Sequence, residues 1–145
     1  MYAKESVDLA LYRMEKAEEC LTDAQDNLQW GKYGTAANRS YYAIFNAMRA
    51  LLNLEGRDFK RHSGVISEFR RTFIKTGVLD SKFSAVIRDA FDLRNASDYD
   101  DFYVISKERV KAQTEDAAEF TQAVRRCLAE RVSGDGKYKV MGIWS

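Results

Sequence analysis

Residues 35–52, TAANRSYYAIFNAMRALL, decide the fold class. Apolar side chains recur in this stretch at alternating steps of four and three residues, at Ala37, Tyr41, Ile44, Met48 and Leu51. This spacing places them along one side of an α-helix. Because Tyr42, Phe45 and Leu52 widen the apolar stripe, we expect this helix to be central and buried on more than one side.

Two longer stretches at either end of the chain show the same periodicity. Between residues 6 and 30 the apolar positions are Ala10, Met14, Ala17, Leu21, Ala24 and Leu28. Between residues 106 and 131 they are Val110, Thr114, Ala117, Thr121, Val124 and Leu128. Two matching stripes predict that the first and last helices pack together in a bundle.

Glycines and capping residues set the expected helix ends. Residues 31–34 predict a turn, with Thr35 as the N-cap of the second helix and Gly56 at its end. A third helix is expected from Ser63 to Gly77, and a fourth over residues 81–94. Residues 95–103 are rich in Asp, Ser and Asn and predict a loop, after which Ser106 begins the last helix.

The chain contains no proline, so nothing interrupts these helical patterns. The prediction is an all-α, up-and-down bundle of four to five helices spanning residues 1–132. Residues 133–145 form a tail with an apolar strip over residues 137–144. The tail is predicted to be disordered, to dock on the bundle, or to contact another subunit.

Composition restricts the function classes. The 145 residues carry a formal net charge of +1, so total charge gives no argument for nucleic acid or membrane binding. The first residues lack the apolar core of a signal peptide, and no apolar run is long enough to cross a membrane. We therefore expect a cytoplasmic protein without membrane contact.

The sequence lacks the residue patterns of most known enzyme active sites. The single histidine, His62, excludes histidine-rich metal sites, and its basic surroundings favour an exposed or capping residue. An acidic group at Asp98, Asp100 and Asp101 has ligands suited to Mg²⁺, but a solvated turn is the better interpretation. We expect no metal and no cofactor.

Basic and aromatic side chains alternate between residues 57 and 75. Six Lys and Arg residues stand against two acids there, interleaved with three phenylalanines. Such clusters hold phosphate backbones while aromatic rings stack on bases. The same phenylalanines also fit a buried helical stripe, and the charges a solvated face.

Four pieces of the sequence occur in an order similar to that of a known family. They are Ala36-Ala37-Asn38-Arg39-Ser40-Tyr41-Tyr42-Ala43-Ile44-Phe45 with Leu51-Leu52, His62-Ser63-Gly64-Val65, Arg94 followed by Ser97-Asp98-Tyr99, and the alanine-rich residues 112–123. Together they resemble the small stand-alone prokaryotic HEPN proteins. The resemblance extends to about Arg131 and leaves out the tail.

This resemblance implies a helical bundle that forms a homodimer. Many HEPN proteins are metal-independent ribonucleases, often toxins encoded beside a minimal nucleotidyltransferase antitoxin. Their motif is an arginine, commonly followed by a polar residue, with a histidine about a turn later. Arg94 and Asn95 match its first half, whereas Tyr99 stands at the histidine position.

That departure changes the expected chemistry. Arg94 suits the stabilisation of phosphate charge, but a tyrosine with a pKa of about 10 is a poor base at neutral pH. The resemblance thus implies an altered or residual ribonuclease with Arg94, Asn95, Asp98 and Tyr99 in the catalytic site. Nucleic-acid-binding roles are expected for Arg39, Arg61 and His62.

Two alternatives remain at this point. In the first, Arg94 forms an ion pair with Asp98 or Asp101 that only fixes the local structure. In the second, the protein is a non-catalytic scaffold or partner of a nucleotidyltransferase, and Arg94 and Tyr99 shape the contact surface. The resemblance implies adenylylation of a tyrosine for some antitoxin pairs, which makes Tyr99 or Tyr103 the expected modification site.

Overall fold

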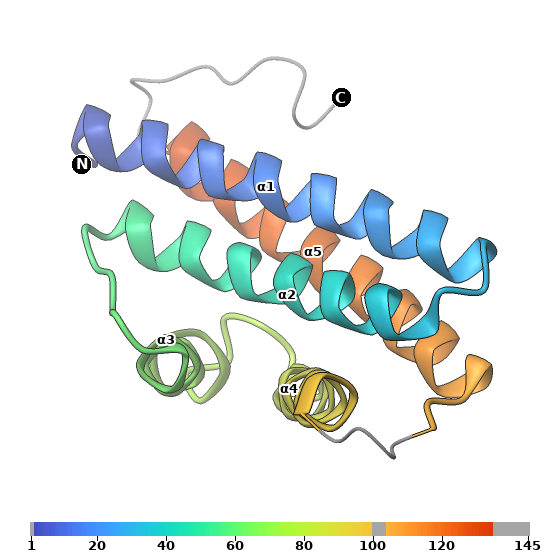
Figure 1. Cartoon of the computed structure of the whole chain (residues 1–145). Helices are drawn as coiled ribbons and strands as arrows, with labels where there is room; N and C mark the ends of the chain where they lie inside the picture. The colour runs from blue at the N-terminus through green and yellow to red at the C-terminus, as the bar shows by residue number, and fades with distance from the viewer. Residues whose placement is uncertain (1, 100–103, 135–145) are drawn as a thin grey trace.

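Five α-helices and one π-helical segment account for most of the described residues, 2–99 and 104–134, of the computed structural model (Figure 1). The α-helices are α1 (Lys4–Gln29), α2 (Tyr33–Leu54), α3 (His62–Phe69), α4 (Phe83–Tyr99) and α5 (Lys107–Gly134). The π-helical segment η1 (Arg70–Ile74) continues α3, with the N–H of Lys75 donating to the carbonyl of Arg70 at 2.9 Å. The all-α prediction is confirmed.

Helix α2 is the centre of the molecule. Tyr41, Ile44, Met48 and Leu51 are fully buried, as the stripe over residues 35–52 predicts. The helix contacts each of the other four α-helices. Its central position is therefore confirmed.

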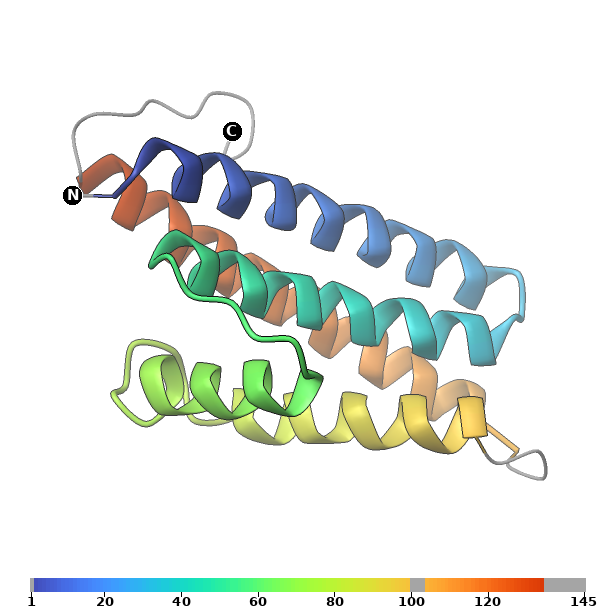
Figure 2. The same cartoon turned by 60° about the vertical axis from the view of Figure 1, so that its left-hand side comes forward.

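The helices form two layers. In the first layer α1, α2 and α5 form a three-helix bundle in which every pair is in contact, with α5 behind α1 and α2 in Figure 1, and in the second layer α3 and α4 run across α2. In the second layer α3 with η1 is antiparallel to α4 (Figure 2). Helices α1 and α5 contact each other, as their matching stripes predict. The apolar core fills the space between the layers.

Two predicted helix ends are confirmed. Gly56 has φ +75° just after α2, a left-handed conformation that glycine adopts without steric cost. At the start of α5 the hydroxyl of Ser106 accepts a hydrogen bond from the N–H of Arg109 at 3.1 Å.

The prediction that Thr35 caps α2 is wrong. The helix begins at Tyr33, with Lys32 at the N-cap position and no capping side chain. Gly31, with φ +77°, forms a tight turn between α1 and α2. The N–H of Ala36 can therefore already donate to the carbonyl of Lys32, at 3.0 Å.

The predicted loop after Arg94 also needs correction, because α4 continues to Tyr99. Neither proline nor glycine interrupts residues 94–99. The side chain of Asp98 turns back to pair with Arg94 one helical turn earlier, at 3.2 Å. The polar composition of residues 94–99 therefore marks the last turns of a helix stabilised by an ion pair rather than a loop.

Three earlier expectations concern residues at the margins of the structure. Ser133 and Gly134 complete α5, and the rest of the predicted tail lies outside the described residues. Asp100, Asp101 and Tyr103 lie outside them too, as does the side chain of Tyr99.

None of the helices described is long and apolar enough to cross a membrane.

Candidate functional site around Arg94

The guanidinium of Arg94 is held between α4 and α2. Its Nε lies 3.2 Å from Oδ2 of Asp98, and its Nη2 donates to the hydroxyl of Tyr42 at 3.1 Å. Its central carbon is 5.3 Å from the ring centroid of Tyr41 and 5.4 Å from that of Tyr42. With only 15% of the side chain exposed, Arg94 is an oriented cation stacked on aromatic rings.

A chain of polar contacts extends from Arg94 along α2. Asn38 donates from Nδ2 to Oδ2 of Asp98 at 3.1 Å. Its Oδ1 accepts from Nε and Nη2 of Arg39 at 3.1 and 2.8 Å. The Arg39 guanidinium lies 5.3 Å from the Tyr42 ring centroid. Asn38 and Asp98 together thus link two arginines whose guanidinium groups both lie over the Tyr42 ring.

The only histidine of the chain lies at the same tyrosine pair. Nδ1 of His62, the first residue of α3, is 2.9 Å from the Tyr41 hydroxyl. The His62 ring packs against Phe45 with centroids 4.1 Å apart, so the residue is half-buried rather than the exposed or capping residue expected. Burial, with the charges of Arg94 and Arg49, lowers the pKa of His62. The imidazole is therefore neutral at pH 7.

Tyr41 connects these groups while remaining uncharged. Its side chain is fully buried, and burial raises the pKa of its hydroxyl despite the opposing charge of Arg94. The hydroxyl therefore stays protonated at physiological pH and can both donate and accept a hydrogen bond.

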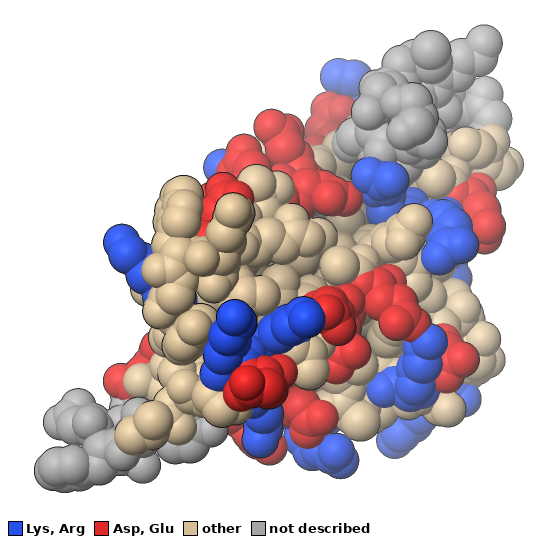
Figure 3. Space-filling view, turned by 90° about the vertical axis from the view of Figure 1, so that its right-hand side faces the viewer, with Lys and Arg blue, Asp and Glu red and all other residues tan. Residues whose placement is uncertain are grey.

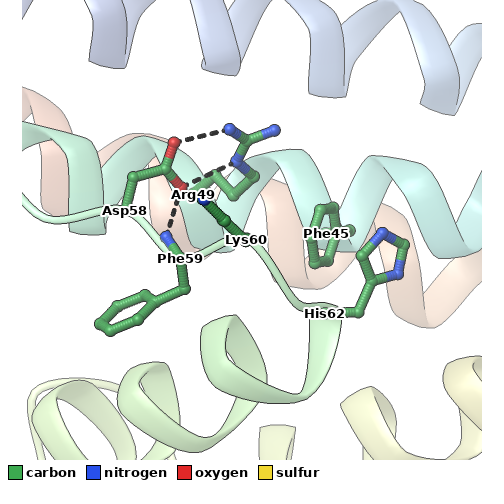
Figure 4. Close-up of a pocket in the computed structure, with 6 residues that line it drawn as sticks. All are labelled: Phe45, Arg49, Asp58, Phe59, Lys60 and His62. Atoms are coloured by element: carbon green, nitrogen blue, oxygen red, sulfur yellow. Dashed lines mark hydrogen bonds and ion pairs between the residues drawn. The ribbon is translucent and has the colours of Figure 1, made fainter.

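A hollow of about 360 Å³ opens on the other side of His62 (Figure 4). The rings of His62 and Phe45 lie at one end, and Asp58 and Arg49 at the other. Arg49 and Asp58 neutralise each other, with Nη2 2.7 Å from Oδ2. Lys60 also lines the hollow, which therefore offers aromatic faces and one further cation.

The close approach of α2 and α4 positions this site. A Cβ atom on Gly34 would lie 3.2 Å from the hydroxyl oxygen of Ser97, closer than most such contacts. Gly34 and Ser97 stand one helical turn or less from Asn38 and Asp98, whose side chains bridge the helices. Small residues here allow that bridge to form.

The structure brings together only some of the predicted site residues. Arg94, Asp98, Arg39 and His62 lie around Tyr41 and Tyr42. Arg61 is exposed beside His62, and no side-chain hydrogen bond or ion pair joins it to other residues in the described ranges. Asn95 is half-buried on α4.

Asn38, Tyr41 and Tyr42 were not predicted as site residues. The signal that the sequence offered is the asparagine–arginine pair at 38–39, one turn before two adjacent tyrosines. The predicted Arg94–Asp98 ion pair is confirmed. Within residues 2–99 and 104–134, no group of three or more His, Cys, Asp or Glu residues has the arrangement of a metal site.

The basic stretch over residues 57–75 is partly neutralised. Glu68 pairs with both Arg57 and Arg71. Acidic and basic side chains also interleave over the face drawn in Figure 3, where no wide area of one sign appears. On this face, attraction of an anion therefore depends on local groups of charges rather than on a wide basic area.

Comparison with known proteins identifies relatives over most of the chain. A family model described as "HEPN domain" matches residues 10–127. A "UPF0332 protein" of Thermotoga maritima is 34% identical over 82% of this chain and 90% of its own length. A "UPF0332 protein" of Archaeoglobus fulgidus is 34% identical over 80% of this chain and 92% of its own. A protein of Methanocaldococcus jannaschii named "Putative toxin MJ0142" is 38% identical over 68% of this chain and 67% of its own.

Proposed function

Since the chain belongs to the HEPN family, we propose that it is a toxin-like domain that binds RNA at Arg94 and retains metal-independent ribonuclease activity. The observation that carries the proposal is the placement of Arg94 and His62 on one tyrosine pair. An oriented guanidinium and a neutral imidazole are the groups that RNA transesterification requires. A homodimer would place two such sites in one cleft.

Each group has a defined role in the proposed reaction. Arg94 binds the scissile phosphate and neutralises the charge that develops on it. With Nδ1–H of His62 donating to Tyr41, Nε2 accepts the proton of the 2′-hydroxyl. The 2′-oxygen then bonds to phosphorus as the bond to the 5′-oxygen breaks, and water protonates the leaving oxygen. The products are a 2′,3′-cyclic phosphate and a 5′-hydroxyl.

The remaining predicted catalytic residues receive supporting roles. Asp98 holds Arg94 through Nε and is itself held by Asn38, so it acts as a positioning residue. Asn95 and Tyr99 remain predictions, with contacts to a bound nucleotide as their proposed role. His62 would supply the proton transfer that the family pattern assigns to a histidine at the position of Tyr99.

The direct test is incubation of the purified protein with single-stranded RNA in the presence of a chelator. We expect cleavage to cyclic-phosphate ends. The rate should fall about 100-fold or more in Arg94→Ala and in His62→Gln. Arg126→Ala, which removes an exposed cation from α5, is the matched control and should cleave normally. Unchanged cleavage by the Arg94 variant would refute the assigned site.

The Arg94–Asp98 ion pair favours a second candidate function. A carboxylate 3.2 Å from the guanidinium competes with any phosphate for it. On this alternative the protein is a non-catalytic partner of a nucleotidyltransferase. Mass spectrometry after co-expression with a neighbouring nucleotidyltransferase should then find a 5′-AMP adduct on Tyr99 or Tyr103. An unmodified chain that cleaves RNA would exclude this alternative.

A further inference from the structure

A groove of about 350 Å³ lies between α3 with η1 and α4, which Figure 2 shows side by side. Ile66, Ile87 and Phe91 provide its apolar lining, with Ile87 almost completely buried. Helix α3 and η1 contribute lining residues from Ser63 to Arg70, which are seven positions apart. Such spacing lines one side of a helix, so the groove runs along the helices.

The polar lining of this groove is entirely basic or neutral. Arg70, Lys75 and Arg88 contribute three cations, Ser63 and Ser67 contribute exposed hydroxyls, and no carboxylate lines it. Arg88 has only an exposed contact with Asp89 at 3.5 Å, which water and salt screen. Here the cations of the basic stretch are not cancelled, in contrast to Arg57 and Arg71.

Arg70 carries a donor that the protein leaves unused. Its Nη2 donates to the carbonyl of Ser84 at 2.9 Å, which fixes the side chain against α4. Its Nε is buried and has no hydrogen-bond partner among residues 2–99 and 104–134. A buried guanidinium N–H without a partner is costly and calls for an acceptor. The guanidinium of Arg70 is thus a fixed cation beside the groove, with its Nε shielded from solvent.

The groove adjoins the candidate site. Phe91 lies in it one turn before Arg94, and its ring centroid is 6.1 Å from that of Tyr41. Ser63 follows His62 in the chain. Arg88 precedes Arg94 by six residues, about 9 Å along the helix axis and about 120° around it, so it lies on a neighbouring side of α4. The groove and the site are therefore close enough for one nucleic-acid strand to reach both.

We propose that the groove between α3 and α4 binds the phosphate backbone of the RNA strand that flanks the phosphate at Arg94. Arg70, Lys75 and Arg88 contact phosphates, while Phe91 offers an aromatic face to a base. The proposal rests on the RNA-binding function proposed above and names the part of the strand that extends beyond the reacting phosphate. It predicts that longer strands bind more tightly than a dinucleotide.

Fluorescence anisotropy with labelled, uncleavable 2′-O-methyl RNA tests this proposal. The probes are a dinucleotide and a strand of about twelve nucleotides, a length within the usual range of single-strand binding sites. The variants are Arg94→Ala, the double variant Lys75→Ala/Arg88→Ala, and a control, Lys4→Ala/Arg126→Ala, that removes the same two residue types from exposed positions elsewhere. Circular dichroism checks that each variant is folded.

The groove variant should bind the long strand at least tenfold more weakly and the dinucleotide as wild type does. Its slope of log affinity against log salt should decrease by about 1.4, because two phosphate contacts are lost. Arg94→Ala should weaken binding of both probes, and the control should change neither.

The other possible outcomes distinguish failure of the groove proposal from failure of the proposed function. If the groove variant binds the long strand normally while Arg94→Ala does not, the groove proposal is wrong and the proposed function stands. If wild-type protein binds neither probe, both are wrong. If polyglutamate binds with the same dependence on Lys75 and Arg88 and displaces no RNA, the groove belongs to an acidic protein partner.

Discussion

Helix α2 has two contrasting interfaces. With the apolar core it makes contacts between apolar side chains, with Ile44, Met48 and Leu51 fully buried. Toward α4 it presents Asn38 and Tyr42, which contact Asp98 and Arg94 through hydrogen bonds. The first interface gains free energy by removing apolar surface from water. The second orders charged groups at little net gain in stability, as expected for the RNA-binding site that we propose.

The largest expected effect tests the apolar interface. Leu51→Ala leaves a cavity at a fully buried position and should lower the free energy of unfolding by about 2–5 kcal/mol. Urea denaturation measures this change, with the exposed Leu9→Ala on α1 as a control that should change it far less. A loss below about 1 kcal/mol would show that this interface does not dominate stability.

Arg94→Ala tests the polar interface and should cost about 1–2 kcal/mol, the sum of a partly exposed ion pair and cation–π contacts. The same urea titration measures it. In contrast to Leu51→Ala, this variant should lose little stability but much of the RNA binding or cleavage. A loss above about 4 kcal/mol would instead make Arg94 a structural residue.

Asn38→Ala should cost about 1 kcal/mol, because it removes the hydrogen bonds that link Asp98 with Arg39. We expect RNA affinity to fall several-fold as Asp98 loses its second anchor, with the charge of Arg94 retained. Asn38→Gln, which keeps the amide but displaces it, should give an intermediate affinity. Equal affinities for wild type and both variants would remove Asn38 from the site.

The smallest effect is a pH dependence of stability. Burial and the charges of Arg94 and Arg49 lower the pKa of His62 in the folded protein. The unfolded chain therefore binds the proton more readily, and stability decreases as pH falls below the unfolded value of about 6.5. The contribution of neutral His62 to the free energy of unfolding is fully present above about pH 6.5. It should be missing in His62→Gln, as the difference between urea midpoints at pH 7.5 and 5.5 will show.

Periodicity in the sequence was sufficient for the fold but not for the whole site. The stripe through Tyr41 and Leu51 specifies a central helix because burial repeats with the helical turn. The Arg94–Asp98 pair was predictable for the same local reason, a spacing of four residues. The helix starts and ends were less certain, since Gly31 displaced the cap expected at Thr35.

Contacts between distant residues could not be predicted. Arg94 and Tyr42 are 52 positions apart, Asn38 and Asp98 are 60 apart, and His62 and Tyr41 are 21 apart. Nothing in local patterning encodes which sides of α2, α3 and α4 face one another. The position of His62 beside the tyrosine pair therefore depends on how these helices cross, which the sequence does not reveal.

The π-helical segment η1 has a consequence for how the groove can vary among related chains. A π-turn holds one residue more than an α-turn, so loss of a single residue between 70 and 74 would leave a regular helix along nearly the same path. An i→i+5 turn covers about the same rotation as an i→i+4 turn of an α-helix, so the side chains that follow, including Lys75, would keep their places. Related chains can thus differ by one residue here without moving the cations of the groove or disturbing the bundle.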